Sequence, residues 1–280
     1  MILVTGSSGL VGGEVANRLA PHAPVRLAVR DLARDGGADG AERVRFDFLD
    51  PGTFEAALRG VAAVFLLRPP RLARAKHDFG PFVAAMRTAG VGRAVFLSVR
   101  GAGRNPLLPH RRIEVLLEAS GLDWTHLRPN DFMQNFATVH RADIRDHGEI
   151  WARAGRGRTS LVDVRDVANA AVRTLTEPGH ERRAYTLTGS AAFDLDEVAA
   201  VLSAALGRPV AYRNPGTLAF LRHVRAAGRP LAFGLVMTGV YTAARLGLAA
   251  EVTPDLARLI GRPPTALQDF VRDYAGVWRP

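Results

Sequence analysis

The stretch MILVTGSSGLVG, residues 1–12, decides the fold. An apolar run typical of a strand leads into three glycines, Gly6, Gly9 and Gly12, with the spacing GxxGxxG, and a helical pattern follows. Gly6 can take the tight turn from strand to helix, Gly9 lets backbone N–H groups approach a pyrophosphate, and Gly12 lets helix and strand pack closely. A helix that begins at such a turn also favours an anion at its N-terminus.

This stretch therefore predicts a dinucleotide site, because the glycines stand in the strand, turn and helix context that the motif requires. The alternative is a glycine turn whose phosphate site is vestigial. The residues of the turn that we predict to contact the cofactor are Thr5, Gly6, Ser8, Gly9, Leu10, Val11 and Gly12.

Downstream of the turn, strand-like and helix-like segments alternate through the first half of the chain. The strand candidates are short and rich in β-branched or aromatic residues. They lie at residues 1–5, 25–29, 44–46, 61–67, 93–98 and 124–127, and helical spacing marks residues 12–20, 51–58, 79–89 and 111–119. This alternation predicts an α/β fold with a doubly wound parallel sheet of Rossmann type, whose ligand lies at the carboxyl ends of the strands.

The alternation loosens beyond about residue 131. Residues 163–175 and 194–206 have helical patterns, residues 185–187 have a strand pattern, and residues 216–275 form a mostly helical tail. No Gly/Ser-rich or Pro-rich linker separates the two parts. We therefore predict an NAD(P)-binding core over residues 1–130 and a smaller, mostly helical C-terminal substrate region over residues 131–280, interleaved with the core.

The end of the second predicted strand bears on the choice of cofactor. An acidic residue there binds a ribose 2′-hydroxyl, whereas an arginine suits a 2′-phosphate. Arg30 occupies this end, Asp31 follows, and Arg34 is a further basic candidate. The sequence favours NADP(H) over NAD(H), while Asp31 keeps NAD(H) open and Arg30 could instead point into water.

Composition excludes several classes of site. The chain has no cysteine, so disulfides, thiolate nucleophiles and zinc–thiolate sites are absent. The formal charge of +10 suggests nucleic-acid binding, but the basic residues, all but one of them arginine, are scattered without an interleaved aromatic patch. We predict no nucleic-acid partner. His140, Asp143 and His147 could share a helical face as metal ligands, but their alternating charges are more typical of a solvated surface, and we predict no metal.

The longest apolar run extends from Leu231 to Ala244 and contains two glycines. It is shorter than the ~20 residues that a membrane-spanning helix needs. We expect a buried helix or a lid over an apolar substrate, with an interfacial membrane helix as the alternative, and predict no membrane association. The first residues do not resemble a signal peptide, so we expect a cytoplasmic protein.

Motifs along nearly the whole chain resemble the NmrA-like family of atypical short-chain dehydrogenase/reductases, which bind NAD(P) on a Rossmann domain. Beyond the glycine turn, the matching segments are VRD at 29–31, DF at 47–48, VFLL at 64–67, LS at 97–98, HRRIE at 110–114, LRPNDFMQNF at 127–136 and VDVRDVA at 162–168. Together they are more specific than the glycines alone.

The resemblance implies roles for residues outside the turn. Arg30 would read the adenosine phosphate, Asp47 and Phe48 would border the adenine, and the segment beginning Leu66, Leu67 and Arg68 would run beside the cofactor ribose. Around the nicotinamide it implies Ser98, His110, Pro129, Asn130 and Phe132. Each has a structural alternative, such as Phe48 in the core, Ser98 as a strand-end cap, and residues 128–136 as a loop entering a helix.

The sequence departs from ordinary short-chain dehydrogenases at the catalytic pair. Those enzymes use Tyr-x-x-x-Lys, but the one lysine here, Lys76, has no such tyrosine before it, and none of the four tyrosines lies in the first half of the chain. The single lysine of the related isoflavone-reductase-like branch is replaced by His110. An imidazole can act as a general acid near neutral pH, so His110 is our candidate catalytic residue, with Ser98 a lesser one. A solvated His110 is the alternative.

These observations predict an NADPH-dependent oxidoreductase that reduces a quinone, an enone or a similar conjugated carbonyl compound. The reduced oxyanion of such a substrate is delocalised, so its protonation does not require a tuned Tyr-Lys pair. We expect a small apolar or aromatic substrate, and the sequence leaves a homodimer open. The alternative is a non-enzymatic NADP-sensing regulatory protein that acts through a protein partner.

Overall fold

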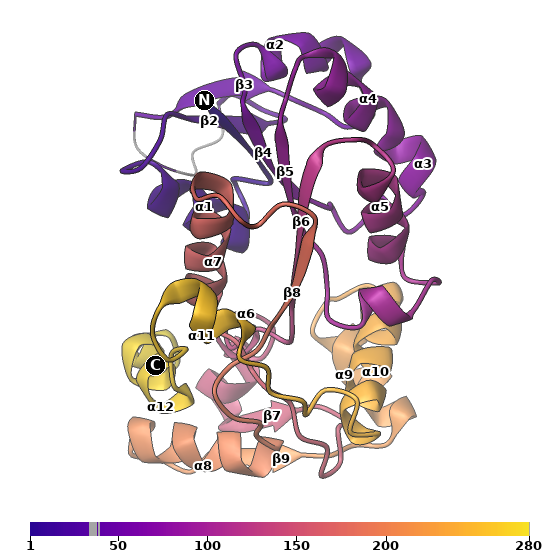
Figure 1. The fold of residues 1–280 in the computed structure, drawn as a ribbon. Helices are drawn as coiled ribbons and strands as arrows, with labels where there is room; N and C mark the ends of the chain where they lie inside the picture. The colour runs from indigo at the N-terminus through magenta and orange to yellow at the C-terminus, as the bar shows by residue number, and fades with distance from the viewer. Residues whose placement is uncertain (34–37, 39, 280) are drawn as a thin grey trace. The chain divides into compact units, whose positions relative to one another are not determined.

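The computed structural model describes residues 1–33, 38 and 40–279 (Figure 1). Arg34, one of the basic candidates, lies outside the described residues. The main sheet of the described chain has seven parallel strands in the order β3-β2-β1-β4-β5-β6-β8. Their bounds are β1 Ile2–Thr5, β2 Val25–Val29, β3 Glu42–Arg45, β4 Ala63–Leu67, β5 Arg93–Leu97, β6 Asp123–Pro129 and β8 Arg183–Leu187.

Helices cover both faces of this sheet, which confirms the predicted Rossmann-type fold. Helices α1 (Leu10–Leu19), α7 (Val164–Thr176) and α11 (Asp255–Ile260) pack on one face. On the other face lie α2 (Phe54–Leu58), α3 (Ala75–Asp78), α4 (Gly80–Thr88) and α5 (Pro109–Glu118). Central strands β2 and β4 are almost entirely buried, as parallel strands between two helical layers are; β4 is a continuous apolar run, whereas β2 is apolar except for the buried Arg26. The edge strand β3, with the sequence ERVR, is charged and largely exposed.

The sheet contains one strand more than the six that the alternation predicted. Residues 185–187 have a strand pattern, and the structure extends this segment to β8 and pairs it in parallel with β6. The connection between these two strands passes through residues 130–182 and includes α6 (Gln134–Thr138) and α7. Because the pairing strands lie so far apart along the chain, local alternation could not place β8 in the sheet.

The chain divides into two compact units. Unit 1 carries the sheet and consists of residues 1–129, 164–187 and 255–262, whereas unit 2 consists of residues 130–163, 188–254 and 263–280. Unit 2 contains a two-stranded parallel sheet of β7 (Glu149–Trp151) and β9 (Ala211–Arg213). Its helices include α6 and α8 (Leu195–Leu206). The predicted helical tail contributes α9 (Thr217–Ala226), α10 (Leu231–Arg245) and α12 (Leu267–Tyr274).

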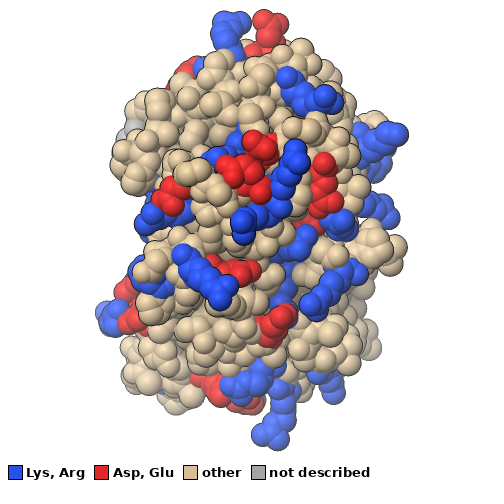
Figure 2. Space-filling model, viewed as in Figure 1, with Lys and Arg blue, Asp and Glu red and all other residues tan. Residues whose placement is uncertain are grey.

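The predicted apolar run forms α10, which is only partly buried. Gly234, Tyr241 and Ala244 are buried, while Leu235 and Val236 are exposed. Across the described part of the chain, every helix is too short or too polar to span a bilayer. On the face seen in Figure 2, Lys and Arg side chains are interspersed with Asp and Glu.

Candidate functional site

The glycine turn joins β1 to α1 and is fastened to β4. Gly6 has a φ of +67°, a left-handed conformation that glycine adopts without strain. The preceding Thr5 Oγ1 donates a hydrogen bond to the Phe65 carbonyl oxygen at 3.1 Å and accepts the Leu67 N–H at 2.8 Å. A Cβ on Gly6 would lie 3.1 Å from Leu67 Cδ2. The turn is therefore held against the carboxyl end of β4, where the ligand of a doubly wound sheet binds.

The other two glycines allow a close backbone approach. A Cβ on Gly12 would lie only 2.2 Å from the Gly6 carbonyl oxygen, and one on Gly9 would lie 3.3 Å from the same atom. Gly9 also precedes the first residue of α1 and offers no side chain to cap the helix. The first N–H groups of α1 thus face the space in front of the turn without a side-chain acceptor, which suits an anion.

Two further observations make the turn fit a pyrophosphate. The Ser7 hydroxyl is buried, and no hydrogen-bond partner for it is found among the described residues. Ser8, Gly9 and Leu10 are exposed at the mouth of the turn. A buried polar atom without a partner is unfavourable, so an acceptor brought by a ligand would satisfy it. The turn fits the dinucleotide that the sequence predicts, and Ser7 is a candidate contact that sequence reasoning missed.

The residues predicted for the adenosine half lie beside strands β2 and β3. Arg30 follows β2 and is exposed. The carboxylate of Asp47 accepts a hydrogen bond from the Leu49 N–H, and the backbone N–H of Asp47 donates to Thr53 Oγ1. The loop after β3 is therefore tightly folded. Arg30 and Asp47 stay predictions as cofactor contacts.

Phe48 has a clear structural role. Its ring is buried and lies 4.8 Å, centroid to centroid, from the rings of both Phe46 and Phe79. Phe48 therefore lies in the hydrophobic core, and its contact with the adenine stays a prediction. Leu66 is likewise fully buried in β4.

Arg68 and His110 contact each other at the carboxyl ends of the central strands. Arg68 Nε donates to His110 Nε2 at 3.2 Å, and Arg68 Nη1 donates to the carbonyl oxygens of Pro69, Pro70 and Leu72. Burial, and next the charge of Arg68, lower the pKa of His110 to about 4. His110 is therefore neutral at pH 7 and acts as a hydrogen-bond acceptor in this arrangement.

Ser98 belongs to a buried network at the ends of β5 and β6. Its hydroxyl donates to Glu114 Oε1 at 2.6 Å, and Arg128 holds the same carboxylate with bonds of 2.8 and 2.9 Å to its two oxygens. Burial raises the pKa of Glu114, but the hydrogen bonds from Arg128 and then Ser98 outweigh it, and the pKa lies below its usual value. Glu114 is therefore an ionised carboxylate that fixes the direction of the Ser98 hydroxyl.

Sequence reasoning missed Glu114 and Arg128 as part of this site. Glu114 stands four residues after His110 in α5, so both side chains project from one helical face. That spacing was visible in HRRIE, but the partners of Glu114 come from two other elements, which only the fold brings together.

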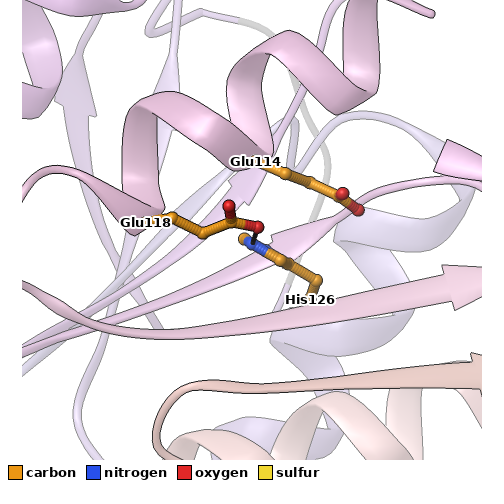
Figure 3. Close-up of side chains that lie close together, drawn as sticks. All are labelled: Glu114, Glu118 and His126. Atoms are coloured by element: carbon orange, nitrogen blue, oxygen red, sulfur yellow. Dashed lines mark ion pairs between the residues drawn. The ribbon is translucent and has the colours of Figure 1, made fainter. Parts of the chain in front are cut away.

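Glu114 also belongs to a group that could be mistaken for a metal site. Glu114, Glu118 and the buried His126 place one oxygen or nitrogen each within 4.8 Å of one another (Figure 3). Arg111 donates to both carboxylates, at 3.2 Å to Glu114 and 2.6 Å to Glu118. Guanidinium groups thus already supply the positive charge, and the absence of a metal stays our prediction.

The residues that follow β6 belong to two units. Pro129 ends the strand in unit 1, whereas Asn130 and Phe132 belong to unit 2. Asn130 Nδ2 donates to Ser160 Oγ at 2.7 Å and to the Ala249 carbonyl oxygen at 2.8 Å. The Asn130 amide therefore ties together loops of unit 2, and contact of Pro129, Asn130 and Phe132 with the cofactor stays a prediction.

The chain is similar to proteins that bind NAD(P)H. The sequence model of a family described as NAD(P)H-binding matches residues 6–178. An NAD(P)H azoreductase of Xenophilus azovorans is 35% identical over 290 residues, which cover 99% of each chain. A (4-alkanoyl-5-oxo-2,5-dihydrofuran-3-yl)methyl phosphate reductase of Streptomyces griseus is 36% identical over 287 residues, which cover 100% of each chain. The solved structure of Escherichia coli NADPH-dependent quinone oxidoreductase QOR2 with NADPH matches with a TM-score of 0.87 and 27% identity, over 98% of this chain and 99% of that one.

Proposed function

The chain belongs to the NAD(P)H-binding family, within the NmrA-like class of atypical short-chain dehydrogenase/reductases, and on this basis we propose that it is an NADPH-dependent reductase of quinones, enones and similar conjugated carbonyl compounds. The observation that carries the proposal is the glycine turn, in which a Cβ at Gly12 would overlap the Gly6 carbonyl oxygen. So close a backbone approach, with open N–H groups at the start of α1, supports a bound pyrophosphate.

The substrate class follows from the protonation that the site can support. When bound, the reduced nicotinamide supplies a hydride, that is, two electrons and one proton. A quinone that accepts it becomes a hydroquinone monoanion and needs one further proton. His110 accepts a hydrogen bond from Arg68 and is neutral at pH 7, so water is the simpler proton source. A delocalised oxyanion tolerates this better than the basic alkoxide of a simple alcohol.

The relatives support the same class. The Escherichia coli neighbour is named for quinones. The Streptomyces relative is named for a dihydrofuran whose ring double bond is conjugated with a carbonyl group. The azoreductase is named for a different group, an azo bond, which also accepts a hydride and a proton. An acceptor with a polarised or electron-poor multiple bond is common to all three names.

The proposal includes a preference for NADPH over NADH. Arg30 lies exposed at the end of β2, where a 2′-phosphate would be bound. The solved QOR2 structure contains NADPH, which supports the preference. Asp31 follows directly, but its carboxylate accepts the Ala33 N–H, so the loop itself uses part of its capacity to accept a ribose hydroxyl.

The proposal is tested by following nicotinamide fluorescence of NADPH mixed with the purified protein. Menadione, 2-cyclohexenone and an azo dye are then added separately, with butanal as the unconjugated control. We expect the emission to change on mixing and to decay with at least one conjugated acceptor but not with butanal. Decay with butanal alone would contradict the substrate class, and no binding, confirmed by calorimetry, would contradict the cofactor assignment.

The same experiment separates the enzyme from the NADP-sensing protein that the sequence leaves open. Binding of NADPH without turnover of any acceptor favours the sensor. The absence of a Tyr-x-x-x-Lys pair from the sequence keeps this alternative in view.

A further inference from the structure

Arg68 lies at the half of the sheet that should hold the nicotinamide. In a doubly wound sheet the dinucleotide crosses the point where the strand order reverses, and each half binds one nucleotide. Here that point lies between β1 and β4. Arg30 marks the β2 side as the adenosine half, so the reacting ring belongs to the side of β4 and β5. Arg68 follows β4 directly, next to Leu67, whose N–H is bonded to Thr5.

The guanidinium of Arg68 is fixed on one edge by its own loop. Nη1 donates to the carbonyl oxygens of Pro69 at 3.2 Å, Pro70 at 3.0 Å and Leu72 at 2.8 Å. Three acceptors around one nitrogen leave the planar group little freedom to rotate. The loop therefore sets the direction in which the remaining N–H groups point.

His110 fixes the adjacent position of the same guanidinium. Because a guanidinium has only donors, His110 Nε2 must be the acceptor of the 3.2 Å bond from Arg68 Nε. The imidazole is then neutral and carries its proton on Nδ1. His110 thus orients Arg68 instead of competing with it for an anion.

The second terminal nitrogen of Arg68 remains available. Among the described residues no hydrogen bond to Nη2 and no carboxylate partner for Arg68 is found, in contrast to Arg128, which is paired with Glu114. Burial lowers the pKa of Arg68 below its usual value, although an arginine stays charged. A partly buried, immobilised cation with two unused N–H donors is arranged to receive an oxygen anion from outside the protein.

We propose that Arg68 is a catalytic residue, that its Nη2 binds the substrate carbonyl oxygen and the negative charge which that oxygen gains, and that His110 is a positioning residue for it. This inference rests on the proposed reductase function. The hydride forms an O–H bond with one carbonyl oxygen of the quinone, the ring becomes aromatic as its π electrons shift, and the second carbonyl oxygen, beside Arg68, takes the electron pair and the charge of the hydroquinone monoanion. Water then supplies the proton, and NADP⁺ and hydroquinone leave. The role differs from the cofactor-ribose contact that the sequence predicts for Arg68.

The test compares two naphthoquinones of similar shape. 2-Hydroxy-1,4-naphthoquinone is an anion at neutral pH, whereas menadione is neutral. Binding of each to the NADP⁺-loaded protein is measured by difference absorbance, for wild type and for Arg68→Met, Arg68→Lys and His110→Gln. We expect Arg68→Met to weaken the anion at least tenfold and menadione less than threefold. Arg68→Lys keeps the positive charge but lacks the planar set of N–H donors, so it should show an intermediate loss of affinity for the anion. It also serves as the test variant if Arg68→Met does not fold.

Kinetics with menadione supply the second measurement. Arg68→Met should lower kcat at least a hundredfold with a small change in KM, because the lost contact strengthens as charge develops. Gln can accept a hydrogen bond as His does, so His110→Gln should retain most of kcat and His110→Ala should not. Loss of this rescue, with Gln as poor as Ala, would contradict the positioning role.

Two outcomes overturn the role of Arg68. If Arg68→Met binds the anion as wild type does, Nη2 does not receive it. If Arg68→Met weakens NADPH and both naphthoquinones alike, Arg68 is a cofactor contact. Failure of the proposed function appears separately, as a wild-type protein that binds NADPH and turns over no acceptor, and the anion-binding comparison still decides the role of Arg68 in that case.

Discussion

A methyl group at Gly12 would lie 2.2 Å from the Gly6 carbonyl oxygen, a distance at which one backbone segment must move. Gly12→Ala should therefore displace the glycine turn from α1. We expect a loss of about 1 to 3 kcal/mol in the free energy of unfolding, as for other overpacked sites, and at least a tenfold loss of NADPH affinity by calorimetry.

Gly239→Ala is the matched control, because a Cβ there meets nothing within 4 Å inside helix α10. Alanine in a helix interior is favoured over glycine by about 0.5 to 1 kcal/mol, so this variant should gain stability and bind NADPH normally. An unchanged NADPH affinity in Gly12→Ala would show that the turn does not cradle the cofactor.

Arg30 tests the choice between the two cofactors. A charged hydrogen bond to a 2′-phosphate contributes about 1.5 to 3 kcal/mol. Arg30→Ala should therefore raise the Kd of NADPH roughly ten- to a hundredfold and leave that of NADH within twofold. Arg87→Ala, at an exposed position of α4, controls for the loss of a positive charge. Equal weakening of both cofactors would mean that Arg30 does not read the phosphate.

At the scale of helices and strands, several arginines act as anchors for helix ends. Arg26 in β2 donates from Nη1 to the carbonyl oxygens of Ala57 and Arg59 at the end of α2. Arg93 in β5 donates in the same way to Thr174, Leu175 and Glu177 at the end of α7. Terminal helix carbonyls carry partial negative charge, which a cation stabilises. Part of the arginine excess is therefore explained by the fold, without reference to a polyanion.

Arg93→Met should remove one such anchor while keeping the length of the side chain. The three carbonyl oxygens lose their hydrogen-bond donor, and Glu181 loses the guanidinium with which it forms an ion pair at 2.6 Å. Hydrogen bonds to charged groups each contribute about 1.5 to 3 kcal/mol, so we expect the free energy of unfolding in urea to fall by at least that amount. Arg87→Met should change it by less than about 0.5 kcal/mol. A loss no greater than that of Arg87→Met would show that the anchor is redundant.

For the molecule as a whole, the sequence predicted what local patterns encode. The glycine turn, the buried strands and the alternation of helices with strands carry their own signals, and β2 has the predicted bounds, Val25–Val29. Membership of β8 in the sheet and the attachment of α11 to unit 1 depend on contacts between distant segments, which no local pattern contains.

The same distinction holds for the candidate site. The motif HRRIE drew attention to His110, but the hydrogen bond from Arg68 that fixes its protonation comes from another strand end. Ser98 was predicted, while its partner Glu114 was not. The role of Glu114 depends on the hydrogen bond from Arg128, which comes from another strand and is not visible in the helical spacing. Residue types can be predicted from motifs, whereas charge states and hydrogen-bond directions require the fold.

The stability of the two units should respond differently to acid. Burial lowers the pKa of His110 and His126 in unit 1, and of His140 in unit 2, from the ordinary 6.5 to about 4. Between these values the unfolded chain binds the proton and the folded chain does not, so stability is full above pH 6.5 and falls as the pH drops toward 4. Asp131 in unit 2 has the opposite sign. Burial raises its pKa from 3.8 to about 6, so its contribution to stability grows as the pH falls from 6 to 4.

At pH 5 His110 and His126 of unit 1 therefore act together, and His180 of the same unit, whose pKa burial also lowers, acts in the same direction. His140 and Asp131 of unit 2 nearly cancel. One proton corresponds to about 1.4 kcal/mol per pH unit, so His110 and His126 together should cost unit 1 about 3 kcal/mol per pH unit, while unit 2 should lose close to none. Trp124 reports on unit 1, and Trp151 and Trp278 report on unit 2. Urea unfolding of Trp151→Phe/Trp278→Phe and of Trp124→Phe, at pH 7 and pH 5, follows each unit separately.

His126→Gln should remove about 1.4 kcal/mol per pH unit from the pH dependence of unit 1 and leave unit 2 unchanged. Trp124 stacks on His126 with ring centroids 4.4 Å apart, so the fluorescence of this tryptophan senses the histidine directly. Equal losses of stability at both reporters between pH 7 and pH 5 would contradict a separate response of the two units. In that case the two units unfold in one transition, and the stabilising protonation of Asp131 offsets the loss from the histidines of both units.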